Sequence, residues 1–200
     1  MPNQNPEFKK LTGFIFLIGF VFSAYQITMA AYHPLSSQIV RVLHVGFLLL
    51  MIFVLYAPKT KEGSVLKHPL GLLSYVAAFL GFTLSLYHWY FEPDLIARAG
   101  EPTMFDTYIG AVIILLVFEA ARRVMGIALP LICATFILYA LFGQQLPGIL
   151  MHRGYPLEQL IDHLGFGTEG IYGIPTFVSS SYIFLFILFG SFLEQAGMIK

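Results

Sequence analysis

Charged residues are scarce in this sequence, and their scarcity excludes most soluble folds. Only 11% of the 200 residues are Asp, Glu, Lys or Arg, against about 25% in soluble domains. Hydrophobic residues make up 58%, including 20 phenylalanines. A soluble fold of this length could not bury so much apolar surface, so we expect lipid to solvate most of it. The 11 basic and 11 acidic residues form no polybasic block, so we expect no nucleic-acid partner.

The chain also lacks the residues that most enzymes and metal sites need. Its single cysteine, Cys133, lies in an apolar run and excludes a disulfide or a cysteine-ligated metal within one chain. No Walker loop, hydrolase nucleophile elbow or HExxH motif is present, and no His, Cys and Asp set has metal-ligand spacing. We therefore predict no catalytic residue, no metal ligand and no organic cofactor.

The N-terminal pattern predicts a retained membrane helix rather than a cleaved signal peptide. A signal peptide has a short apolar region and a cleavage site with small residues. Here Lys9 and Lys10 run directly into an apolar segment long enough to cross a bilayer.

Long apolar runs are what the sequence has in abundance. A helix needs about 20 mostly apolar residues to cross a bilayer. Asp106 is the expected N-cap of the fourth run, and Pro130 predicts a kink or a late start in the fifth. The predicted fold is an all-α polytopic membrane protein with about six transmembrane helices. The six segments are 11–32, 39–56, 69–89, 107–121, 125–142 and 174–192.

Basic residues orient these helices, because Lys and Arg favour cytoplasmic loops. With the N-terminus inside, eight of the 11 basic residues lie on the cytoplasmic side, and Arg41, Arg98 and Arg153 lie outside. The opposite orientation reverses this bias. We therefore predict a cytoplasmic N-terminus and, with six spans, a cytoplasmic C-terminus.

Two long connections, 88–106 and 144–173, fall on the predicted outer side. Within the second, the segment 155–164 (YPLEQLIDHL) places Leu and Ile side chains at helical spacing, with polar side chains opposite. This pattern predicts a short amphipathic periplasmic helix that lies on the membrane surface or against another part of the protein.

Glu119 lies near the inner end of the fourth segment, with Arg122 and Arg123 three and four residues later. The simplest interpretation is a helix-end ion pair whose arginines reach toward lipid headgroups. The alternative is a contact at the junction of two domains, 1–123 and 124–200. The boundary is placed here because the first four helices have short loops, whereas Pro, Gly and a surface helix interrupt the later ones.

Three consecutive serines, Ser179, Ser180 and Ser181, interrupt the last apolar segment behind a glycine-punctuated approach. Small residues let helices pack closely, and serine hydroxyls can hydrogen-bond to the preceding turn. Alternatively the serines line a polar pathway at mid-depth, where transporters tend to place binding sites. Thr168, in the approach, is the fourth candidate for either role. An intramembrane serine protease would need a histidine paired with the serines, and the fourth to sixth segments contain none.

Two histidines of the spans suggest a different class of protein. His44 on the second segment and His88 at the end of the third both lie toward the predicted outer side. Two such side chains could ligate a haem between helices, whereas the simpler interpretation is an interfacial or hydrogen-bonded histidine.

The later part of the chain resembles a known family. The segments EAARRVMGIALPLICATFILYALFGQQLPG and HLGFGTEGIYGIPTFVSSSYIFLFILFGSFLEQAGM are similar to the fused permease of tripartite ATP-independent periplasmic (TRAP) transporters, of the type served by TAXI solute-binding proteins. The run from TEGIYGIP to FLEQAG resembles the start of the large membrane subunit. The EAARR junction and the four segments before it resemble the small subunit fused in front. The resemblance covers the whole chain in architecture and is specific from about Glu119 onward.

The resemblance implies a division of labour within the membrane. In that family a four-helix small part is a fixed scaffold, and a large part with two re-entrant hairpins carries solute and sodium ions across. Fused permeases are far longer than this sequence, and their hairpins follow the segment present here. No ion-binding or substrate-binding residue is therefore carried over to any position. The resemblance implies sodium or a proton as coupling ion at a site outside this sequence, and the remainder of the large domain as a partner.

The expected function is a permease component of an ion-gradient-driven secondary transporter in the inner membrane of a bacterium or archaeon. It would take up a small organic solute, with a carboxylate as the expected class, delivered by a periplasmic TAXI-type binding protein. The alternatives are a haem-binding anchor subunit of a redox enzyme and a purely structural membrane scaffold. We expect no enzymatic activity.

Overall fold

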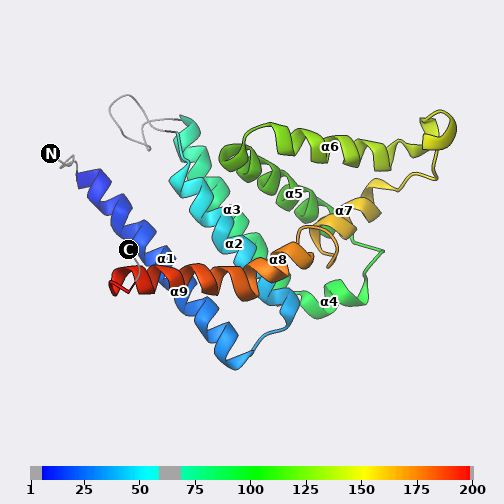
Figure 1. Ribbon diagram of the computed structural model, residues 1–200. Coiled ribbons are helices and arrows are strands. Elements are labelled where there is room, and N and C mark those ends of the chain that lie inside the picture. Colours follow the sequence, from blue (N-terminus) through cyan, green and yellow to red (C-terminus); the bar gives the residue numbers. More distant parts are fainter. Residues whose placement is uncertain (1–5, 59–68, 199–200) are drawn as a thin grey trace. The chain divides into compact units, whose positions relative to one another are not determined.

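The computed structural model describes residues 6–58 and 69–198 (Figure 1). Every regular element in these two ranges is a helix, as an all-α membrane protein requires. The predicted cytoplasmic loop that contains Lys67 lies outside the described residues. The elements are α1 (Pro6–Tyr32), α2 (Ser37–Leu55), α3 (Pro69–Tyr90), α4 (Glu92–Ala97), α5 (Met104–Met125), α6 (Ala128–Leu141), η1 (Gly143–Gln145), η2 (Gly148–Leu150), α7 (Leu157–Gly165), α8 (Ile174–Val178), η3 (Ser179–Ile183) and α9 (Phe184–Gln195).

Among the described residues, five helical runs are long and apolar enough to cross a membrane. They agree with five of the six predicted segments to within a few residues at each end. Their outer faces carry large apolar side chains, and Phe16, Phe79 and Phe186 are each more than 70% exposed. Lipid tails solvate such side chains, so this exposure fits a polytopic membrane protein. The five runs are Gly13–Tyr32, Ser37–Leu55, Leu70–Tyr90, Met104–Met125 and Ile174–Gln195.

The fifth predicted segment, 125–142, forms a shorter helix than its apolar run suggested. α6 has 14 residues, which gives about 21 Å at 1.5 Å per residue; the apolar core of a bilayer is about 30 Å thick. Gly126 ends α5 with a φ of +83°, a conformation that favours glycine. α6 starts two residues later with Pro130 in its first turn, so the late start expected from that proline is observed.

The start of α5 corrects one prediction. Asp106 is not the N-cap; Thr103 is, and the helix begins at Met104. The Thr103 side chain accepts a hydrogen bond from the Asp106 backbone N–H, and the Asp106 carboxylate accepts one from the Thr103 N–H. This reciprocal capping box satisfies two backbone donors that a helix start leaves open. The sequence pattern missed it because both residue types are good caps.

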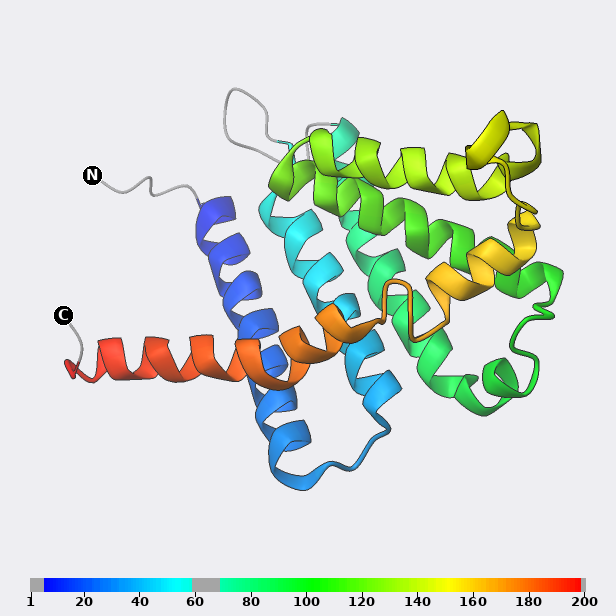
Figure 2. The same ribbon diagram turned by 45° about the vertical axis from the view of Figure 1, so that its right-hand side comes forward.

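The chain forms two compact units, and the first contains residues 1–85 together with 174–200. In this unit α9 crosses α1, and α8 contacts α2 (Figures 1 and 2). Its apolar centre is aromatic: the rings of Phe22 and Phe47 stack with centroids 4.9 Å apart, and Phe184 of α9 lies 4.6 Å from Phe22. The last apolar segment is therefore packed on the first two helices of the chain.

The second unit contains residues 86–173, with α5 at its centre (Figure 2). The predicted amphipathic helix is observed as α7, and it packs against α5 rather than lying free. The contact needs glycine: a Cβ at Gly110 would lie 2.6 Å from Ile161 Cγ2, and one at Gly165 would lie 3.1 Å from the Gly110 Cα. These two units divide the chain by packing alone, and the boundary predicted near residue 124 stays a prediction.

Candidate functional site

The three serines start a π-helix, η3, inside the last membrane-spanning run. The Phe184 N–H donates to the carbonyl oxygen of Ser179, five residues earlier, whereas an α-helix would use a four-residue step. The Ser180 hydroxyl donates to the Phe177 carbonyl oxygen at 3.1 Å. Such single-turn π segments occur often at functional sites. The serines are thus both packing residues and the site of a local change in helix geometry.

A chain of buried polar groups joins this π-helix to α2 and α1. His44 Nε2 lies 3.1 Å from Ser179 Oγ, and His44 Nδ1 is hydrogen-bonded to the Gln26 side-chain amide. Gln26 and His44 are each 1% exposed. The two ring nitrogens of His44 thus face different neighbours, Gln26 on the Nδ1 side and Ser179 on the Nε2 side. Two consecutive helices and a distant π-helix therefore share one polar link inside an apolar region.

The link contains a hydrogen-bonded serine and histidine, the two residue types of many nucleophilic sites. The sequence pattern did not predict this pair. The search for a histidine partner covered the fourth to sixth segments, whereas the partner comes from the second. A nucleophilic serine must also face a space that a substrate can enter. Residues of a nearby cavity include Ser180 and Ser181 but neither Ser179 nor His44. The geometry supports a structural link between helices and no nucleophile.

The same contacts bear on the haem alternative. Both ring nitrogens of His44 are already engaged by Gln26 and Ser179. His88 belongs to the other unit, where its ring packs 5.4 Å from Phe166 and 5.2 Å from Tyr172. Burial raises the pKa of the Tyr172 hydroxyl above its ordinary value, so this side chain stays protonated and neutral. These surroundings favour the interpretation of both histidines as buried core residues.

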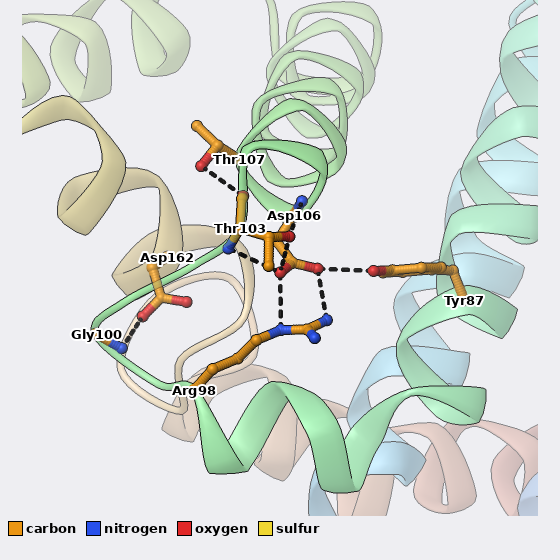
Figure 3. A network of polar contacts seen from close by, with 7 residues as sticks. All are labelled: Tyr87, Arg98, Gly100, Thr103, Asp106, Thr107 and Asp162. Atoms are coloured by element: carbon orange, nitrogen blue, oxygen red, sulfur yellow. Dashed lines mark hydrogen bonds and ion pairs between the residues drawn. The ribbon is translucent and has the colours of Figure 1, made fainter.

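Asp106 is the centre of a second polar network (Figure 3). Its carboxylate has no exposed surface and makes a two-point contact with the Arg98 guanidinium, at 2.8 and 3.0 Å. The Tyr87 hydroxyl donates to it at 2.7 Å, and Thr103 donates from both its backbone N–H and its side chain. A buried carboxylate needs such partners. The network fixes the 91–103 connection to the start of α5.

The same connection is joined to α7. The Gly100 N–H donates to the Asp162 carboxylate at 2.9 Å (Figure 3). Beyond α7, the glycine-rich approach folds back in a tight turn, in which the Ile171 N–H donates to the Leu164 carbonyl oxygen. A Cβ at Gly170 would collide with the backbone of Leu164. The glycines therefore serve close backbone packing in this turn, where Thr168 lies exposed.

Glu119, Arg122 and Arg123 form the ion pairs expected from their spacing. Arg122 contacts both Glu119 carboxylate oxygens, at 2.7 and 2.8 Å, and Arg123 contacts one of them at 2.7 Å. All three side chains belong to the last turns of α5, where basic residues also complement the helix dipole. The geometry is that of a helix-end ion pair; the role at a domain junction stays a prediction.

Comparison with protein families finds a match for the later part of the chain. Residues 112–200 match the family described as "Tripartite ATP-independent periplasmic transporter, DctM component". This part of the chain is similar to the membrane permease component of TRAP transporters. No curated protein and no solved structure matches the chain. The match confirms the resemblance to a TRAP transporter permease that the sequence motifs indicated.

Some of the site residues lie within the matched segment, and the others lie before it in the sequence. The match spans the Glu119 ion pairs, Thr168 and the serine run. Gln26, His44 and Asp106 lie ahead of it. The Ser179–His44 bond thus connects the TRAP permease segment to a helix outside the match. Among the described residues, no group of three or more His, Cys, Asp or Glu side chains is placed to hold a metal ion.

Proposed function

We propose that this chain is the permease part of a secondary transporter driven by a gradient of sodium ions or protons. It takes up a small organic solute, with a carboxylate as the expected class, from a TAXI-type periplasmic binding protein. Its location is the inner membrane. The ion and solute sites belong to the remainder of the large domain, as the family resemblance implies.

The family match at residues 112–200 is the observation that carries this proposal. Five helices of spanning length support a membrane location, and the sequence has no nucleotide-binding motif, which favours an ion gradient as the energy source. The match itself supports a membrane permease component of a TRAP transporter, whereas the binding protein, the solute class and the coupling ion are the further proposed parts.

The packing of the first unit suggests which role this part of the permease has. The run from α8 to α9 carries the family match, and it packs on α1 and α2 through Phe184, Phe22 and the Ser179–His44 bond. A helix tied in this way to the N-terminal helices suits a fixed frame better than a moving element. We therefore assign it to the scaffold.

Uptake measurements in proteoliposomes test the proposal. The full-length gene product is reconstituted, and uptake of radiolabelled carboxylates is measured with a candidate binding protein and an imposed sodium or proton gradient. We expect accumulation only when binding protein and gradient are both present, and its loss when an ionophore dissipates the gradient. Accumulation that needs neither would refute this function.

A visible spectrum of the same purified protein separates the haem alternative. A bis-histidine haem gives a Soret band, which the transporter should not show. A Soret band that disappears in both His44→Ala and His88→Ala would instead establish the redox anchor.

A further inference from the structure

A cavity of about 400 Å³ lies within the first unit, beside the π-helix. We call it the serine cavity. Its volume is in the range of pockets that hold small organic ligands. The residues that decide its chemistry come from α1, α2 and the last spanning run: Gln26, Met29, Val40, Ser180, Ser181 and Leu185.

Gln26 gives the serine cavity an unsatisfied polar group. Its side chain is 1% exposed, and its amide nitrogen is already bonded to His44. Its Oε1 atom is buried and has no hydrogen-bond partner in the part of the chain that the structure describes. Buried polar atoms in native proteins nearly always have a hydrogen-bond partner. We therefore expect the partner of Gln26 Oε1 to come from outside the described residues, as a bound molecule would.

The surroundings restrict what that group can be. The residues lining the cavity include no Lys, Arg, Asp or Glu. Arg41 is not a lining residue, but it contacts two of them: its guanidinium lies 5.0 Å above the Phe177 ring and donates a hydrogen bond to Ser37. A metal cation would find no carboxylate in the lining, and a carboxylate would find no lysine or arginine in the lining itself. The lining is otherwise largely apolar, which suits an uncharged molecule with a hydrocarbon part.

A hydroxyl group fits this position better than other neutral polar groups. If the Gln26 amide is oriented as described, its oxygen needs a donor; if the amide is rotated, its nitrogen needs an acceptor. A hydroxyl can do either, and it can also pair with the Ser181 hydroxyl of the same cavity. We propose that the serine cavity binds an uncharged amphiphilic alcohol, with its hydroxyl at Gln26 and Ser181 and its apolar chain beside Met29 and Leu185. This proposal does not rest on the transport function.

Photolabelling with a diazirine derivative of octanol tests the proposal. The full-length protein in lipid nanodiscs is labelled, digested and mapped by mass spectrometry. We expect adducts on peptides that cover residues 26–40 and 177–185, displaced by excess 1-octanol and not by n-octane. Equal displacement by n-octane would mean apolar partitioning without hydrogen bonding, and adducts confined to other peptides would place the site elsewhere; either outcome overturns the proposal.

Two substitutions make the test specific. Leu185→Trp should fill the cavity and lower labelling of both peptides by about tenfold, whereas its neighbour Phe186→Trp, at a 73% exposed position outside the lining, should leave labelling unchanged. Ser181→Ala should lower labelling about threefold, as the loss of one neutral hydrogen bond predicts. Thermal unfolding checks that each variant is folded, and Ala30→Phe, on α1, replaces Leu185→Trp if that variant is not. Unchanged labelling in a folded cavity-filling variant would refute the site.

Discussion

At the scale of single residues, the buried carboxylate of Asp106 makes the most contacts that hold a connection between helices in place. Three contacts that hold the connection between α3 and α5 pass through it: the Arg98 guanidinium, the Tyr87 hydroxyl and the Thr103 cap. An aspartate in this position was expected to start a helix. It does so indirectly, because its third-position role in the capping box leaves its second oxygen free for Arg98 and Tyr87.

We expect Asp106→Asn to destabilise the protein by about 2–3 kcal/mol. The substitution leaves the Arg98 charge without its partner, and the effect falls below the roughly 3–5 kcal/mol of fully buried pairs because Arg98 is 32% exposed. Unfolding in mixed detergent micelles measures the change. Glu101→Gln, at an exposed position in the same connection, is the control and should change stability little. Equal effects of the two variants would contradict the network.

Gly110→Ala tests the contact of α5 with α7. The added methyl group would overlap Ile161 Cγ2 and Phe166 Cε2, so we expect a loss of about 1–3 kcal/mol from overpacking. Gly190→Ala is the matched control, because a Cβ at that helical position meets nothing within 4 Å. Alanine should be neutral or slightly stabilising there. Thermal melting of both variants compares them, and a tolerated Gly110→Ala would show that α7 does not pack as described.

At the scale of elements, the π-helix is the feature with the most consequence. One extra residue in a helical turn changes which side chains face the neighbouring helices. Here it accompanies the contacts of Ser179 with His44, of Ser180 with the preceding turn and of Ser181 with the cavity. α6 shows the opposite case, in which a glycine and a proline shorten a run that is apolar enough to span.

A double-mutant cycle measures the link between α2 and the π-helix. We expect His44→Phe and Ser179→Ala to show a coupling of about 1 kcal/mol in unfolding free energy, the size of one buried hydrogen bond. The control cycle pairs His44→Phe with Ser180→Ala, whose hydroxyl is bonded to Phe177 and not to His44. Those two changes should be additive. Additivity in the Ser179 cycle as well would mean that the Ser179–His44 contact carries no stability.

At the scale of the whole molecule, the predicted topology can be checked directly. Reporter fusions after Lys67 and after Arg123 should report a cytoplasmic location, because basic residues concentrate on that side, and a fusion at Gly100 should report a periplasmic one. Paired alkaline phosphatase and fluorescent-protein reporters give opposite signals on the two sides. A cytoplasmic signal at Gly100 would mean that the number of spans before it is wrong.

The sequence by itself determined that this is an all-helical membrane protein, where five of its spanning segments lie, and which family the part from about Glu119 onward resembles. Hydrophobicity over about 20 residues decides a spanning helix locally, and motifs such as EAARR are local too. The spacing of three and four residues from Glu119 to Arg122 and Arg123 likewise predicted their ion pairs. Only the tertiary structure decided that Ser179 meets His44, 135 residues away, and that α7 needs a glycine, Gly110, on α5. These contacts depend on which helices pack together, and a pattern within one segment does not say which other helix will pack against it.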